Sequence, residues 1–112
     1  MNKTLIGKKN EIKAVKYLSD KGFKILTTNF STRYGEIDII AQKENVLVFV
    51  EVRSKKSDIY GYAEETITQK KIDRIKKTAE IFLVENNCLF DEVRFDVIAI
   101  TNQNLRHIED AF

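Results

Sequence analysis

The 112-residue sequence contains no proline, one cysteine, one histidine and four glycines. Without proline-rich or glycine-rich stretches, no segment is typical of a linker or a low-complexity tract. The single cysteine, Cys88, cannot form an internal disulfide, and this favours a reducing, cytoplasmic environment. The single histidine, His107, has no partner at metal-ligand spacing, so we interpret it as a packing or hydrogen-bonding residue.

Two further absences narrow the class of protein. No apolar run approaches the ~20 residues that a membrane-spanning helix needs, and the start MNKTLIGKKN lacks the apolar core of a signal peptide. Lysine and arginine exceed aspartate and glutamate by only 19 to 17, so any surface for a polyanionic partner must be local. The chain is long enough for one domain and too short for two, and 43% of its residues are hydrophobic, as in a globular protein. We therefore predict a single soluble, cytoplasmic domain spanning residues 1–112.

The order of the periodic segments predicts a mixed α/β sheet. Apolar residues at helical spacing indicate a helix over residues 8–20, with Gly22 as a stop signal. A second helix carries the apolar stripe from Ile72 to Leu83. The strand-like segments are 23–30, 35–41, 46–54 and 92–100, with a short extended piece over 105–108. Short connections predict an antiparallel meander of the first three strands, and the second helix is a crossover that makes the third and fourth strands parallel.

Acidic residues interrupt this apolar pattern. The third strand begins with five consecutive apolar residues and then contains Glu51 and Arg53. The second strand contains Asp38, and side chains two residues apart on a strand share a face. If the two strands are neighbours, Asp38 and Glu51 converge beside large apolar residues. Such a pair needs positive compensation, for which Arg53, a lysine of the second helix and a divalent cation are the candidates.

A third acid, Glu11, has an unexpected position. It lies at the head of the apolar stripe of the first helix and therefore points towards the sheet. An oxygen-rich metal site accounts for all three acids. Carboxylates without a Cys or His cluster favour Mg²⁺ or Mn²⁺, and such ions typically act on phosphates. The pattern therefore indicates metal-assisted hydrolysis of a phosphodiester.

The motifs around these acids also carry a resemblance to known families. GEIDIIA followed by LVFVEVR resembles the split acidic motif of the PD-(D/E)XK nuclease superfamily. Together with NEIKAVKYL, GFKILTTNF, RFDVIAI and the terminal HIEDAF, these segments resemble the YraN-like family of small bacterial proteins over most of the chain. The resemblance implies a restriction-endonuclease-like core, related to that of Holliday-junction resolvases, and nuclease activity on DNA. This core has the order of elements that the periodicity predicts.

The resemblance also implies a role for each acid. Asp38 and Glu51 match the metal ligands of the superfamily. The carbonyl of Val52 would complete the inner shell of the ion. Glu11 matches the glutamate of the first helix, which would support the ion through water.

The chain departs from the superfamily pattern at two positions. Ile37 stands in the place of its proline, where the motif is loose. Arg53 stands in the place of its lysine, and a guanidinium can hold a phosphate or a water but cannot act as a general base. Lys71 in the second helix is then the candidate for the missing ammonium group, and Gln69 is a weaker one.

Each of these residues also has an ordinary structural interpretation. Asp38 and Glu51 can be exposed acids of an edge strand. Arg53 can form an ion pair with either acid in an inactive descendant of a nuclease. Glu11 can interact with the helix dipole, and the lysines of the second helix can form a solvated face.

Four other residues and the C-terminus lie outside this set. Arg33 and Tyr34, in the turn STRYGEID, can contact a nucleic-acid backbone and a base or remain solvated. Arg94 and Asp96 alternate onto one strand face, and we expect them to pair with each other or to support the polar edge of the sheet. We expect Phe112 to pack on an apolar surface of its own chain or of a second copy, which leaves a homodimer open.

Three classes of function remain. The first is a metal-dependent endonuclease acting on DNA, including branched or otherwise structured DNA. The second is a non-catalytic nucleic-acid-binding or adaptor protein that keeps the nuclease fold. The third is a structural module that touches no nucleic acid, which only the near-neutral charge supports.

Overall fold

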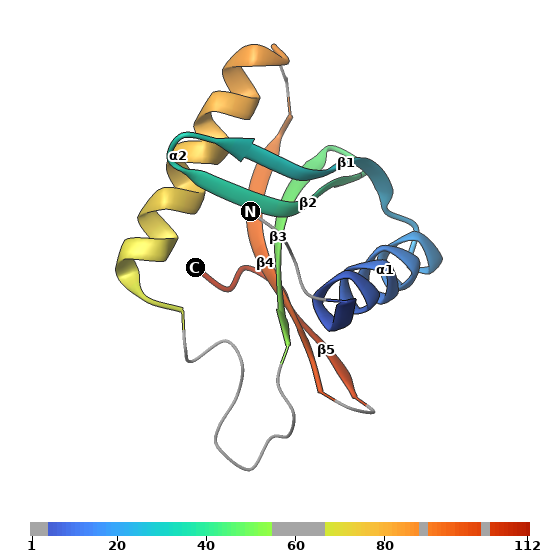
Figure 1. Cartoon of the computed structure of the whole chain (residues 1–112). Helices are drawn as coiled ribbons and strands as arrows, with labels where there is room; N and C mark the ends of the chain where they lie inside the picture. Colours follow the sequence, from blue (N-terminus) through green and yellow to red (C-terminus); the bar gives the residue numbers. More distant parts are fainter. Residues whose placement is uncertain (1–4, 55–66, 88–89, 102–103) are drawn as a thin grey trace.

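The computed structural model of the chain describes residues 5–54, 67–87, 90–101 and 104–112, so Cys88 lies outside the described residues. The elements follow the order α1 (Leu5–Asp20), β1 (Lys24–Thr32), β2 (Gly35–Lys43), β3 (Val46–Ser54), α2 (Gln69–Glu85), β4 (Glu92–Ile100) and β5 (Leu105–Ile108). The strands form one sheet in the order β1-β2-β3-β4-β5 (Figure 1). Neighbouring strands are antiparallel except β3 and β4, which are parallel. The predicted α/β class, with its meander followed by a crossover helix, is confirmed.

Three strands have the predicted bounds, and the other elements differ at their ends. β1 continues to Thr32 and β2 to Lys43, because backbone pairing with the neighbouring strand extends through exposed polar residues such as Ser31. α2 begins at Gln69, where the hydroxyl of Thr68 accepts a hydrogen bond from the backbone N–H of Lys71 at 3.2 Å. Strand pairing and the capping side chain set these ends, and the apolar pattern registers neither. Neither helix in the described part of the chain is long and apolar enough to cross a membrane.

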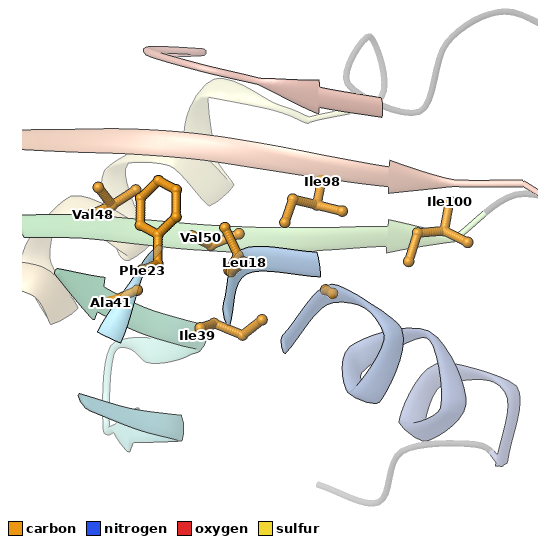
Figure 2. Packing of buried hydrophobic residues seen from close by; sticks show 9 residues of the cluster. Leu18, Phe23, Ile39, Ala41, Val48, Val50, Ile98 and Ile100 are labelled. Atoms are coloured by element: carbon orange, nitrogen blue, oxygen red, sulfur yellow. The ribbon is translucent and has the colours of Figure 1, made fainter. Parts of the chain in front are cut away.

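The two helices cover opposite faces of the sheet (Figure 1). α1 packs on one face through a cluster that includes Leu18 and Val50 (Figure 2). α2 packs on the other face through a cluster that includes Phe82 and Phe49, whose ring centres are 5.9 Å apart. Because successive residues of β3 belong to different clusters, the strand is buried on both sides, as its continuous apolar run predicts.

The α2 face of the sheet changes from apolar to charged along β3. Leu47 and Phe49 are buried in the α2-side cluster, and Glu51 is the next residue of β3 with this orientation. In β2 the alternation is not strict, because Ile37 and Ile40 both belong to the α2-side cluster although they are three residues apart. Ile37 therefore departs from the period-two alternation of β2 at this end of the strand. Pairing between β2 and β3 ends at Ile39 and Val50, so Ile37 and Asp38 lie outside the common register of the two strands.

A polar cluster joins β4, β5 and α1 on the other face. Asp96, whose side chain is 0% exposed, accepts hydrogen bonds from Arg94 at 2.8 and 3.0 Å and from the backbone N–H of Asp110 at 3.0 Å. It also lies 2.6 Å from Nε2 of His107, and Nδ1 of His107 lies 3.1 Å from the hydroxyl of Tyr17. The predicted pairing of Arg94 with Asp96 and the hydrogen-bonding role of His107 are confirmed.

The C-terminal residues pack on their own chain. The ring of Phe112 stacks on that of Phe95, with the centres 5.6 Å apart. The backbone N–H of Ala111 donates to the carbonyl of Phe95 at 2.7 Å. Of the two surfaces predicted for Phe112, the structure shows the one within the chain.

Candidate functional site

A pocket of about 750 Å³ opens where the charged end of β3 faces the first turns of α2. Five of the six predicted site residues line it: Asp38, Glu51, Val52, Arg53 and Lys71. These residues come from β2, β3 and α2, so the site depends on the packing of α2 against the sheet. The predicted convergence of Asp38 and Glu51 on one pocket is therefore seen.

Asp38 lies where β2 separates from β3. The last paired residues of these strands are Ile39 and Val50. Beyond them a side chain replaces the backbone pairing, because the N–H of Val52 donates to Oδ2 of Asp38 at 2.8 Å. This hydrogen bond fixes the carboxylate, which is 7% exposed, at the opening between the strands.

The same geometry aims the carbonyl of Val52. In an extended strand the N–H and C=O of one residue project to the same edge. Since the N–H of Val52 points to Asp38, its C=O also projects towards β2, past the last β2–β3 pair. A carbonyl oxygen and a carboxylate are thus directed to the same gap in the sheet.

Glu51 is buried, and cations only partly compensate its charge. It is 6% exposed, with Nζ of Lys71 at 2.7 Å and Nη1 of Arg53 at 3.9 Å from its Oε1. Burial raises the pKa of Glu51, and the charge of Asp38 raises it further, while Lys71 and Arg53 lower it without cancelling the increase. The two cations therefore do not fully offset the combined effect of burial and of the Asp38 charge on Glu51.

The backbone of Lys71 is held in place, whereas its side chain is partly exposed. Its backbone is anchored by the N-cap Thr68, and its side chain is 41% exposed, so the ammonium group can move between Glu51 and the open pocket. The side chain of Arg53 is 24% exposed. The weaker candidate, Gln69, instead donates to Asp73 at 2.8 Å on the exposed side of α2 and does not line the pocket.

The third predicted acid does not join the other two. Glu11 is 8% exposed, as its place on the apolar stripe of α1 predicts, but it is not among the residues that line the pocket. Its helix covers the opposite face of the sheet, and at the edge of the site Asn10 donates to the hydroxyl of Ser54 at 2.7 Å. Within the described residues, no three side chains of His, Cys, Asp or Glu form a group suited to a metal ion.

Sequence reasoning missed some of the residues that shape the site. Thr68 carries a readable signal, because threonine is a preferred N-cap residue and it directly precedes the lysine-rich start of α2. The Asn10–Ser54 contact joins residues 44 positions apart and has no local signal. Arg33 and Tyr34 are placed at the turn between β1 and β2, with Tyr34 on the pocket wall.

Comparisons with known proteins identify relatives along the whole chain. The model of Uncharacterised protein family UPF0102 matches residues 10–100, a range that includes every predicted site residue. A UPF0102 protein of Sulfurihydrogenibium sp. is 50% identical over 112 residues, covering 100% of this chain and 97% of the relative. A UPF0102 protein of Persephonella marina is 51% identical over 106 residues, covering 95% and 91%. The resemblance to the YraN-like family is thereby confirmed, and the chain belongs to the UPF0102 family.

Proposed function

We propose that the protein is a metal-dependent endonuclease of the PD-(D/E)XK type, which hydrolyses phosphodiester bonds in DNA, including branched or otherwise structured DNA. The observation that carries this proposal is the buried pair of Asp38 and Glu51 in one pocket, beside the amine of Lys71 at 2.7 Å. The order of elements is consistent with a restriction-endonuclease-like core, and the sequence resemblance supports the same assignment.

The donor set fits Mg²⁺ or Mn²⁺. Asp38, Glu51 and the carbonyl of Val52 offer only oxygen atoms, which these ions prefer. A divalent cation would also supply the compensation that the raised pKa of Glu51 indicates is incomplete. When bound, such an ion polarises a phosphoryl oxygen and lowers the pKa of a coordinated water.

The cations of the pocket then have separate tasks. Lys71 is exposed enough to leave Glu51 and donate to a phosphate oxygen, where it stabilises charge that develops during hydrolysis. Arg53 binds and orients the phosphate or a water, since its guanidinium does not accept a proton. Glu11 acts from α1 through a water rather than as a direct ligand, because it lies outside the pocket wall.

A second candidate is a non-catalytic nucleic-acid-binding or adaptor protein with the same fold. The observation that favours it is that Lys71 and Arg53 both pair with Glu51. In an inactive descendant of a nuclease, these two ion pairs would compensate the charge of Glu51 in place of the metal ion.

Cleavage assays separate the two candidates. Labelled single-stranded, duplex and branched DNA would be incubated with Mg²⁺ or Mn²⁺, and products of the wild type compared with those of Glu51→Gln. The matched control is Glu80→Gln, which removes an exposed acid from α2 outside the pocket. The endonuclease proposal requires metal-dependent products from the wild type and the control only. DNA binding without turnover on any of the three substrates would favour the adaptor.

A further inference from the structure

A second hollow adjoins the pocket at the turn between β1 and β2. It has a volume of about 590 Å³ and shares with the pocket the wall formed by Tyr34, Gly35, Glu36 and Arg74. Arg33 lines only the second hollow. An extended ligand lying in the pocket can therefore continue into the hollow without leaving the protein surface.

Two cations, Arg33 and Arg74, line this hollow together with the acid Glu36, and a third, Lys77, lies beside it on the Tyr34 ring. The guanidinium of Arg33 lies 4.9 Å from the centre of the Tyr34 ring and donates to its hydroxyl at 2.7 Å. Nζ of Lys77 lies 5.5 Å from the same ring centre. Arg74 contributes the third positive charge to the shared wall. A neutral ring orients cations without neutralising them, and no ion pair joins these three residues to a carboxylate within the described parts of the chain.

The turn that carries Arg33 is fixed on α2. The hydroxyls of Thr32 and Thr78 are 3.2 Å apart, and that of Thr78 also donates to the carbonyl of Arg74 at 2.8 Å. Gly35 lies so near the helix that an added Cβ would be 3.5 Å from Cβ of Arg74, an ordinary contact distance. These contacts hold the cations of the turn and of α2 in one arrangement.

We propose that this hollow binds the phosphodiester backbone of the nucleic-acid strand beside the bond held at Asp38 and Glu51, through Arg33, Arg74 and Lys77. This inference rests on the proposed function, and adds to it the direction in which the strand leaves the pocket. The chemistry is that of backbone contacts, which position a strand without reading its sequence. The formal net charge of the chain is only +2, so this local group of cations, rather than overall charge, attracts the polyanion.

The test is the salt dependence of DNA binding, measured without metal so that no cleavage occurs. Fluorescence anisotropy of a labelled single-stranded oligonucleotide would be recorded in EDTA at several salt concentrations. The variant Arg33→Gln with Lys77→Gln removes two cations of the hollow. The control Lys24→Gln with Lys76→Gln also removes two positive charges, from the far end of β1 and from a lysine that lies 5.7 Å from the Phe95 ring centre.

The expected effect follows from counterion release. Each lost phosphate contact to a single strand makes the negative slope of log K against log salt concentration shallower by about 0.7. The loss of two contacts therefore reduces the affinity at 50 mM salt by about 70-fold. The control should bind like the wild type. Equal losses in both double variants, no loss in either, or no binding by the wild type would overturn the proposal.

A metal titration keeps this outcome separate from that of the proposed function. The two exposed substitutions leave the carboxylate pair intact, so Arg33→Gln with Lys77→Gln should retain any Mn²⁺-induced rise in melting temperature. If the slope changes as expected but Mn²⁺ stabilises no variant, the backbone site stands and the metal-dependent activity fails. If Mn²⁺ stabilises the wild type and the slopes of the wild type and the variant do not differ, the metal site stands and the backbone site fails.

Discussion

Replacing Asp38 with asparagine should remove the response to metal without weakening the fold. The amide oxygen of asparagine can still accept the hydrogen bond from the N–H of Val52, which Asp38 accepts at 2.8 Å. Burial is the main cause of the raised pKa of Glu51, and the substitution removes the second cause, the charge of Asp38. We therefore expect Asp38→Asn to be at least as stable as the wild type in the absence of divalent ions.

The size of the lost response can be worked out from linkage. An ion at 100 times its dissociation constant stabilises the native state by about 2.7 kcal/mol. For a chain of 112 residues, about 4–5 °C of melting temperature corresponds to 1 kcal/mol, so the wild type should gain about 12 °C. With one of the two carboxylates gone, most of this gain should disappear.

Thermal unfolding followed by circular dichroism, with Mn²⁺ titrated from zero to saturation, measures both quantities. Glu80→Gln, an exposed acid of α2, is the control and should respond like the wild type. A wild-type melting temperature that does not change with Mn²⁺ would refute the metal site. An Asp38→Asn protein that melts much earlier than the wild type without metal would refute the structural part of the reasoning.

Three further outcomes follow from the structure. Because the pKa of Glu51 is raised in the folded state, the stability that Glu51 contributes is complete below its unfolded-state pKa and is lost as the pH rises through its folded-state pKa. The variant Glu51→Gln should therefore become more stable relative to the wild type as the pH rises through this range. Melting temperature measured against pH tests this. Asp96→Ala should lose about 3–5 kcal/mol in urea unfolding, whereas replacing Glu109, which is 62% exposed, should change stability by less than about 0.5 kcal/mol. Lys71→Gln should reduce turnover about 10²–10³-fold and keep the Mn²⁺-induced thermal shift, while Lys76→Gln should alter neither.

The sequence predicts most of the fold because each element has its own pattern. The apolar run before Glu51 defines β3, and the short connection between β2 and β3 places Asp38 and Glu51 in neighbouring strands. The separation of β2 from β3 is not predictable in this way, since the hydrogen bond from Val52 to Asp38 replaces a backbone pair that the pattern assumes. The 2.7 Å contact of Lys71 with Glu51 depends on how α2 packs on the sheet, which no local signal sets.

Two buried acids in this chain have opposite environments, and the contrast bears on function. Burial of Asp96 tends to raise its pKa, but hydrogen bonds from His107, Arg94 and the backbone of Asp110 together hold that pKa below its ordinary value. The ionised form of Asp96 is thus stabilised by the fold, as expected of a structural group.

Glu51 has cations nearby and still has a raised pKa, so its ionised form is under-compensated. An apolar residue in the place of this buried charge would stabilise the fold at least as well. Phe49, the preceding residue of β3 on the same face, is such an apolar residue. Stability therefore explains Asp96 and does not explain Glu51. An additional cation in the pocket would stabilise the ionised form of Glu51, as the neighbours of Asp96 already do for Asp96. For this reason the functional proposal rests on the acid pair rather than on the fold.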